Sequence, residues 1–136
     1  MAVVVFDSDV LIGFLNPADA HHTEAVALVR DSLAPATRRM LSAVNYSEIL
    51  IGPIKAGKDA RDHVEAMLGH FSIEIMNVDM AFARRAAAVR ARTDLKLPDA
   101  YALATAIHAE HNGHGDVRLA SFDKAVLRAH AELHPN

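Results

Sequence analysis

The sequence predicts an α/β layered fold with a parallel sheet. Short apolar segments alternate along the chain with longer segments of helical periodicity. The first apolar segment, residues 3–6 (Val-Val-Val-Phe), is apolar on both faces, as in a buried central strand. Asp7 follows it directly. Open α/β sheets bind ligands at the carboxyl ends of their strands, so this aspartate marks the edge where a site is expected.

The first third of the chain predicts a strand, two helices and a second strand. Ser8 is expected to cap a short helix over residues 8–15, which Asn16-Pro17 ends. A second helix over residues 20–33 shows apolar residues at helical spacing. Met40-Leu41 is then a candidate for a short strand.

The middle of the chain predicts two helices and a third strand. Ser42 is expected to cap a helix over residues 43–51, and Gly52-Pro53 is expected to end or kink it. A further helix over residues 59–71 precedes the third strand, residues 73–76.

The last third predicts three helices around a fourth strand. Asp79 is expected to cap an Ala- and Arg-rich helix, and Pro98 suits the first position of a helix over residues 98–111. The fourth strand covers residues 117–120, and Ser121 is expected to cap a last helix over residues 123–130.

The composition is that of an ordinary globular protein. The chain has 136 residues, of which 51% are hydrophobic and 23% charged, so one domain over residues 1–136 is expected, with residues 133–136 frayed. The absence of cysteine excludes disulfides, thiolate zinc sites and thiol nucleophiles, and fits a cytoplasmic location. No apolar stretch is long enough to span a membrane, and a net charge of −3 gives no global attraction to nucleic acid.

Four acidic residues fall at the predicted carboxyl edge of the sheet. Asp7 ends the first strand, Glu48 lies in the helix after the second, Asp99 opens the helix at Pro98, and Asp123 follows the fourth strand. Carboxylates gathered in one cleft repel one another, and a divalent metal removes that conflict. Oxygen ligands without cysteine favour Mg²⁺ or Mn²⁺. The chemistry expected is metal-assisted phosphoryl transfer or phosphodiester hydrolysis.

Four segments carry a family resemblance: VVVFDSDVLIGFL, SAVNYSEIL, LPDAYALATAI and LASFD. In type and order they resemble PIN-domain proteins, specifically the single-domain toxins of bacterial VapBC toxin–antitoxin systems. The resemblance spans essentially the whole chain. It implies a PIN-like three-layer fold, with a small parallel sheet of four or five strands flanked by helices, and a Mg²⁺- or Mn²⁺-dependent ribonuclease activity.

The resemblance also implies roles for particular residues and partners. Asp7 and Asp99 would be the principal metal ligands, Asp123 would help to hold metal and water, and Glu48 would complete the shell. Supporting polar side chains around this pocket would be Ser8, Ser121 and Asn45. The implied partners are an RNA substrate, a VapB-like antitoxin that blocks the acidic cleft with an arginine, and a second copy of the chain in a homodimer.

Two further acids stand near these motifs. Asp9 occupies a position where the family more often has Ser, Thr or Asn, and it either adds charge to the pocket or points away along the helix. Asp116 precedes the fourth strand, so it is expected at the opposite edge of the sheet.

Three alternatives remain open. Asp7-Ser8-Asp9 also resembles the first motif of haloacid-dehalogenase-like phosphatases, with Asp7 as nucleophile. A catalytically silent PIN-fold binding module is the second alternative. In the third, His108 and His111, with His114 beyond the helix end, contribute to a zinc site.

The sequence says little about how RNA would be recognised. Lys96 and Lys124 are the basic residues nearest the acidic edge and are candidates for phosphate contacts. Aromatic residues make up only 5% of the chain and there is no tryptophan, so no platform for base stacking is predicted. His21-His22 is expected at the surface, and contact with RNA or a partner is left open as an alternative there.

Overall fold

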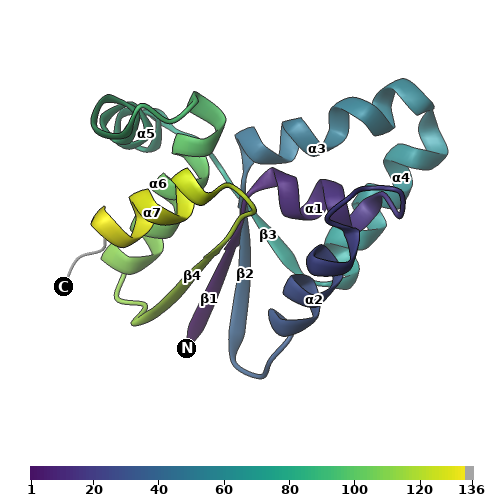
Figure 1. Cartoon of the computed structure of the whole chain (residues 1–136), viewed down its shortest axis with the longest axis horizontal. Coiled ribbons are helices and arrows are strands. Elements are labelled where there is room, and N and C mark those ends of the chain that lie inside the picture. Colours follow the sequence, from purple (N-terminus) through teal and green to yellow (C-terminus); the bar gives the residue numbers. More distant parts are fainter. Residues whose placement is uncertain (134–136) are drawn as a thin grey trace.

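A computed structural model describes residues 1–133 and contains a four-stranded parallel sheet of order β3-β2-β1-β4 (Figure 1). The strands are β1 (Ala2–Phe6), β2 (Thr37–Ser42), β3 (Ile73–Met76) and β4 (Asp116–Ala120). In this view they fan apart toward their amino ends and converge at their carboxyl ends. The predicted α/β class is confirmed. Residues 134–136, within the segment expected to be frayed, lie outside the described residues, whereas Leu133 is the last residue of a helix.

The first strand lies inside the sheet, as its sequence predicts. β1 pairs in parallel with β2 on one side and with β4 on the other. Val3 and Val5 belong to one hydrophobic cluster, and Val4 and Phe6 belong to the other. A strand that is apolar on both faces therefore connects two cores.

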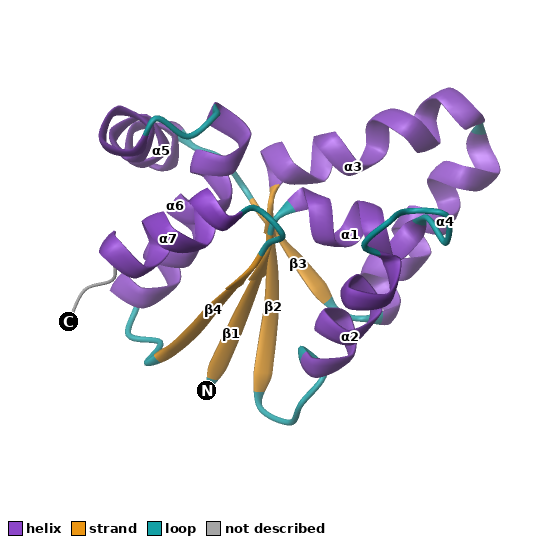
Figure 2. Ribbon diagram, viewed as in Figure 1, coloured by secondary structure: helices purple, strands orange, loops and turns teal. Residues whose placement is uncertain are grey.

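Helices cover both faces of this sheet, which gives three layers (Figure 2). One layer contains α1 (Ser8–Leu15), α2 (His22–Asp31), α3 (Ala43–Ala56) and α4 (Lys58–His70). The other contains α5 (Met80–Thr93), α6 (Leu97–His111) and α7 (Lys124–Leu133). No helix within residues 1–133 is long and apolar enough to cross a membrane.

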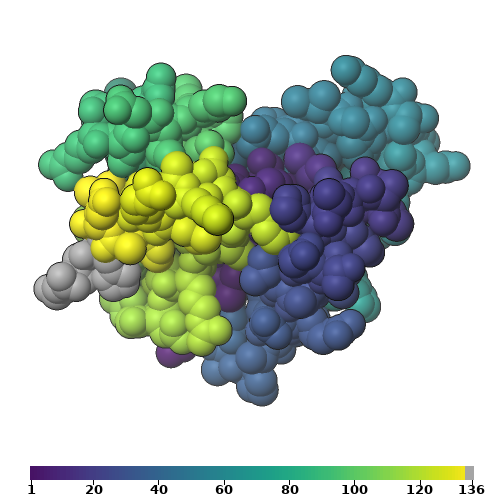
Figure 3. Space-filling model, in the orientation of Figure 1, coloured from purple at the N-terminus to yellow at the C-terminus, as the bar shows by residue number. Residues whose placement is uncertain are grey.

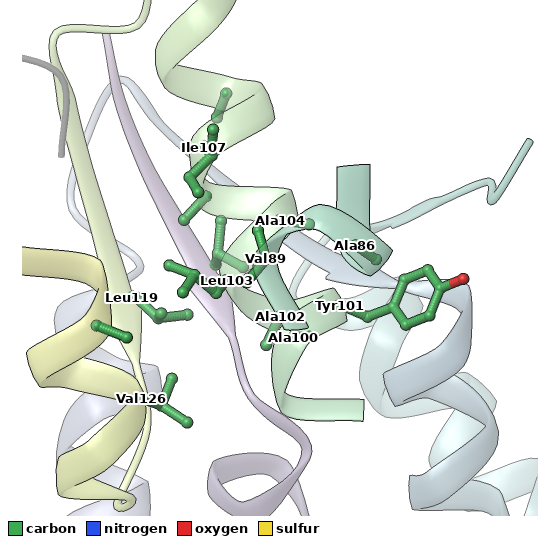
Figure 4. Close-up of a cluster of buried hydrophobic side chains, with 14 of the residues drawn as sticks. Ala86, Val89, Ala100, Tyr101, Ala102, Leu103, Ala104, Ile107, Leu119 and Val126 are labelled. Atoms are coloured by element: carbon green, nitrogen blue, oxygen red, sulfur yellow. The ribbon is translucent and has the colours of Figure 1, made fainter. Parts of the chain in front are cut away.

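α6 is the most deeply buried helix of its layer. Its run of alanines lets the backbone approach the sheet and α5 closely, because alanine occupies little volume. Leu103 of α6 shares one cluster with Val89 of α5 and Leu119 of β4 (Figure 4). This packing holds the first turn of α6, which carries Asp99, against the carboxyl edge of the sheet.

Two helix caps differ from the prediction. Asp7, not Ser8, caps α1, because its carboxylate accepts a hydrogen bond from the Ser8 N–H. Before α7, Asp123 and not Ser121 accepts a hydrogen bond from a backbone N–H of the helix, that of Ala125. The Ser121 hydroxyl accepts from the Asp123 N–H and donates to Asp7. Ser42 and Asp79 cap α3 and α5 as expected.

Of the two outcomes predicted for Gly52-Pro53, an end or a kink, the end of the helix at residue 51 is wrong. α3 continues to Ala56, and the Gly57 N–H bonds to the Pro53 carbonyl. Proline removes one backbone donor and crowds the carbonyl four residues earlier, but the residues on both sides of Pro53 stay helical. Gly57 then ends α3 with φ +127°, a conformation that an L side chain rarely adopts.

Other boundaries shift by small amounts. α2 is shorter than the predicted 20–33, since residues 19–21 form a turn and Leu33 lies exposed beyond the helix. β2 is longer than the predicted pair of residues, and it begins with the polar segment Thr37-Arg38-Arg39.

Candidate functional site

The four predicted acids lie where the carboxyl ends of the strands meet the first turns of the helices. Asp7 follows β1, Glu48 lies in α3, Asp99 is in the first turn of α6, and Asp123 follows β4. Their charges act on one another: the charges of Asp123 and Glu48 raise the pKa of Asp99, and the charge of Asp99 raises the pKa of Asp7. The structure therefore brings the predicted quartet to one edge.

Asp7 is the most buried of these acids, with 2% of its surface exposed. Its Oδ1 accepts from the Ser8 N–H and its Oδ2 from the Ser121 hydroxyl, both at 2.8 Å. Burial and then the nearby Asp9 charge raise the pKa of Asp7 from 3.8 to about 7, although these two hydrogen bonds act in the opposite direction. The carboxylate is thus held firmly in a place where its negative charge is not neutralised.

Asp99 lies at the start of α6, in the first turn of that helix. Burial raises the pKa of Asp99, and the charges of Asp123, Glu48 and Asp9 raise it further. Lys96, just before the helix, acts against this rise. A cation placed between these acids would lower their mutual repulsion.

Asn45 connects the part of the site on α3, which carries Glu48, with the part at the start of α6, which carries Asp99. It is fully buried, and its Oδ1 accepts from the Ser42 hydroxyl at 2.6 Å. Its Nδ2 donates to Glu48 Oε1 and to the Pro98 carbonyl, each at 3.0 Å. One amide therefore orients Glu48 and fixes the start of α6 next to α3, which gives the predicted supporting role of Asn45 a physical basis.

Asp9 adds charge to the site, which decides between the two roles left open by the sequence. Its Oδ2 accepts from the Phe122 N–H at 3.0 Å and lies 3.5 Å from the Ser121 hydroxyl. Its Oδ1 is buried without a hydrogen-bond partner within the described part of the chain. Burial raises the pKa of Asp9, while the backbone N–H of Phe122 acts against that rise. Sequence reasoning left Asp9 out of the site set, although its place two residues after Asp7 was the available signal.

Other candidates lie elsewhere. Asp116 begins β4 at the opposite end of the sheet, beside Arg118 at 3.5 Å. The imidazole of His108 contacts Arg85 at 3.1 Å, whereas His114 lies 3.5 Å from Arg38 on β2. The histidines thus have separate partners, and residues 1–133 contain no cluster that supports the zinc alternative.

The donor set fits a hard divalent cation. All candidate ligands are carboxylate oxygens, and the orphaned, buried Asp9 Oδ1 is an acceptor beside them. As they stand, no three His, Asp or Glu side chains of residues 1–133 converge closely enough to hold an ion. Ion binding would have to draw the acids together, and Asp7, Asp99 and Asp123 are the residues that would do so.

The PIN domain family matches residues 4–133. The chain belongs to this family, which confirms the resemblance and favours the nuclease class over the phosphatase alternative. Sequence comparison with curated proteins finds no significant match.

Solved structures of toxins and toxin–antitoxin complexes have similar folds. A toxin–antitoxin complex from Klebsiella pneumoniae is 25% identical, with a TM-score of 0.66 over 90% of this chain and 87% of that chain. VapC20 from Mycobacterium tuberculosis, a sarcin-ricin loop cleaving toxin, is 20% identical, with a TM-score of 0.70 over 94% and 95%. VapBC2 from Rickettsia felis, bound to a promoter DNA fragment, is 14% identical, with a TM-score of 0.52 over 89% and 99%. The last two likenesses concern the fold alone.

Proposed function

We propose that this chain is the toxin of a VapBC-type, type II toxin–antitoxin system. It is a Mg²⁺-dependent endoribonuclease, with Mn²⁺ as a substitute, that hydrolyses RNA phosphodiester bonds in the cytoplasm. The observation that carries the proposal is Asp7, which is buried, hydrogen-bonded on both oxygens, and close to further carboxylates. Family membership and the similarity to a toxin–antitoxin complex support it.

The roles of the residues follow from their positions. Asp7, Asp99 and Asp123 hold the metal, and Glu48, oriented by Asn45, accepts a proton from the attacking water. A bound Mg²⁺ supplies Lewis acidity toward a phosphate oxygen and lowers the pKa of bound water. The Ser8 backbone N–H and the Ser121 hydroxyl fix the orientation of Asp7, so this one carboxylate is positioned before metal or substrate binds.

The partners are a VapB-like antitoxin and a second copy of the chain. An antitoxin arginine would pair with the acidic edge, because guanidinium groups bind carboxylates with two parallel hydrogen bonds. Ile12 and Leu97, beside this edge, are 40% and 50% exposed and offer apolar surface to such a partner. Ile51 and Ile54 on the outer part of α3 are also exposed and could contribute to a homodimer.

The test is RNA cleavage by the purified protein with Mg²⁺ or Mn²⁺, compared with EDTA. Asp99→Asn should lose cleavage, whereas the control Asp116→Asn, at the other end of the sheet, should keep it. Cleavage that survives EDTA or Asp99→Asn would refute the assignment. An acyl-phosphate on Asp7, formed from a phosphate ester, would point to the phosphatase instead.

A further inference from the structure

A hollow adjoins the acidic edge, between the α1–α2 turn and the loop after β4. It has a volume of about 410 Å³ and is lined by Asp9, Ile12, Asp19, His21, Phe122 and Asp123. We call it the side hollow. It shares Asp123 and Asp9 with the acid cluster, so a group bound there lies next to the reacting centre. Figure 3 shows the dark blue α1–α2 region next to the yellow-green segment that follows β4 on this face.

The side hollow has an aromatic wall that the sequence did not reveal. The rings of His21 and Phe122 stack with centroids 4.8 Å apart and planes inclined by 23°. The His21 side chain is 59% exposed, so it has surface available to a ligand. A flat ring system stacks favourably on such a surface.

Both members of this aromatic pair are fixed by backbone hydrogen bonds to carboxylates. Asp9 accepts from the Phe122 N–H at 3.0 Å, and Asp19 Oδ1 accepts from the His21 N–H at 2.8 Å. These bonds fix the backbone that carries the two rings, and the rings already contact each other without a ligand, which reduces the entropic cost of stacking. Asp19 also keeps acceptor capacity, since its two oxygens offer about four lone-pair positions.

These features define the chemistry of the ligand: it is flat, and it presents N–H donors at its edge. A phosphate is disfavoured, because Asp9, Asp19 and Asp123 would repel it. Guanine presents two adjacent donors, N1–H and N2–H, which match one carboxylate. Adenine and cytosine present only the exocyclic amino group, and uracil flanks its N3–H with two carbonyl oxygens.

We infer that the side hollow is a subsite for a guanine base next to the scissile phosphate, stacked on His21 and hydrogen-bonded to Asp19. This inference rests on the proposed RNA nuclease function and adds to it the base that the chain prefers. His21 and Asp19 are specificity residues outside the metal-binding set. RNA would then run with a base in the side hollow and its phosphate toward Lys96 and Lys124.

The first test is binding, which does not depend on cleavage. The probes are fluorescent uridine oligonucleotides that contain one central guanine, inosine, 7-deazaguanine or uracil, measured by anisotropy in EDTA, in which the proposed nuclease does not cut. The expected affinity is highest and equal for the guanine and 7-deazaguanine probes, lower for inosine and lowest for uracil. Inosine lacks the N2 amino group, whereas 7-deazaguanine keeps both donors. Equal binding of guanine and uracil by the wild-type protein would overturn the inference.

Two variants remove the stacking surface and the acceptor separately. His21→Ala should weaken guanine binding by about five- to a hundredfold, the range for loss of one base–aromatic stack. Asp19→Asn keeps an Oδ1 for the His21 N–H but replaces a second acceptor with a donor, so the preference for guanine should fall by about tenfold. The matched controls are His63→Ala and Asp59→Asn on α4, both exposed, which should change nothing. His21 makes no side-chain cap bond to α2, so thermal unfolding should show that its variant folds normally.

Cleavage separates the failure of this inference from that of the proposed function. A wild-type protein that cuts RNA without preference near guanine, with variants that cut at the same positions, would overturn the subsite alone. Guanine-selective binding without metal-dependent cleavage would overturn the nuclease and leave the subsite standing. If arginine amide displaces no guanine probe, RNA is the occupant. If arginine amide binds at His21 while no oligonucleotide does, the side hollow receives a partner's guanidinium and the inference is wrong.

Discussion

Replacing Asp7 with Asn should stabilise the metal-free protein at alkaline pH while it abolishes cleavage. Asn has nearly the same shape, and its Oδ1 can accept from the Ser8 N–H as Asp7 does. Its Nδ2 would donate to Ser121 Oγ, and the Ser121 hydroxyl would turn to Asp9 Oδ2, now 3.5 Å away. The substitution therefore removes a buried charge and leaves a bonded side chain behind.

The size of the effect follows from the pKa of Asp7, which is 3.8 for an ordinary aspartate and about 7 in the fold. Between these values the unfolded chain loses its proton and the folded chain keeps it, so the free energy of unfolding falls as pH rises. The difference of about 3 pKa units corresponds to about 4 kcal/mol, reached above pH ~7. Below pH ~4 both states hold the proton, and the gain from Asn should be less than about 1 kcal/mol.

The assay is urea unfolding in EDTA at a series of pH values, for the wild-type protein, Asp7→Asn and Asp116→Asn. Asp116 is exposed at the amino end of the sheet, so its variant should follow the wild-type curve at every pH. The Asp7 variant should separate from the wild type progressively between pH ~4 and ~7. The reasoning would be refuted if Asp7→Asn were less stable than the wild type at pH 8. It would also be refuted if the difference in free energy of unfolding were the same at all pH values, because the charge of a carboxylate changes with pH.

Three further predictions concern the same edge and its support. Mg²⁺ should raise the melting temperature of the wild-type protein, but not of Asp7→Asn, because the ion binds only the folded site. Asn45→Asp should cost about 2–4 kcal/mol in urea unfolding, since it puts a buried charge beside Glu48 and loses two donors. Gly13→Val should cost about 1–3 kcal/mol in the same assay, because even a Cβ at Gly13 would lie 3.3 Å from the Ala25 Cβ.

Each of these predictions has a control. Ca²⁺ and Na⁺ at matched ionic strength distinguish a Mg²⁺ site from charge screening, and an equal shift with Na⁺ would contradict specific binding. Asn77→Asp introduces the same charge at an exposed position and should change stability little. Gly52→Ala, where a Cβ meets no atom within 4 Å, should instead stabilise α3 by up to about 1 kcal/mol. If Gly13→Val behaves like Gly52→Ala, α1 and α2 do not pack as described.

The sequence was sufficient wherever local pattern decides structure. Residues 3–6 are apolar without interruption, so both their strand and its buried position were predictable. The edge position of the four acids followed from strand ends alone, because parallel strands share one carboxyl edge. β2 was predicted too short because Arg39 is polar. In the fold its guanidinium donates to the carbonyls of Phe71 and Ser32, which no local pattern indicates.

Features that depend on distant partners were missed. The stacking of His21 on Phe122 joins residues far apart in the chain, so neither the low aromatic content nor the local sequence indicated this ring pair. Asp9 was ambiguous because a helix leaves its direction open, and only the approach of the Phe122 N–H fixes it. Asn45 was a weak candidate because its two donor bonds, to Glu48 and Pro98, become visible only when α3 and α6 are placed together.

The hydrogen bond from Ser121 to Asp7 has a consequence for synthesis. It joins the end of the first strand to the loop after the last, across 114 positions of the chain. β4 must also insert beside β1 before that loop reaches Asp7. A growing polypeptide therefore carries Asp7 from the start but cannot form this hydrogen bond until the final strand and the loop after it have left the ribosome. The acidic edge of the sheet is therefore completed only after β4 and the loop that follows it have been synthesised.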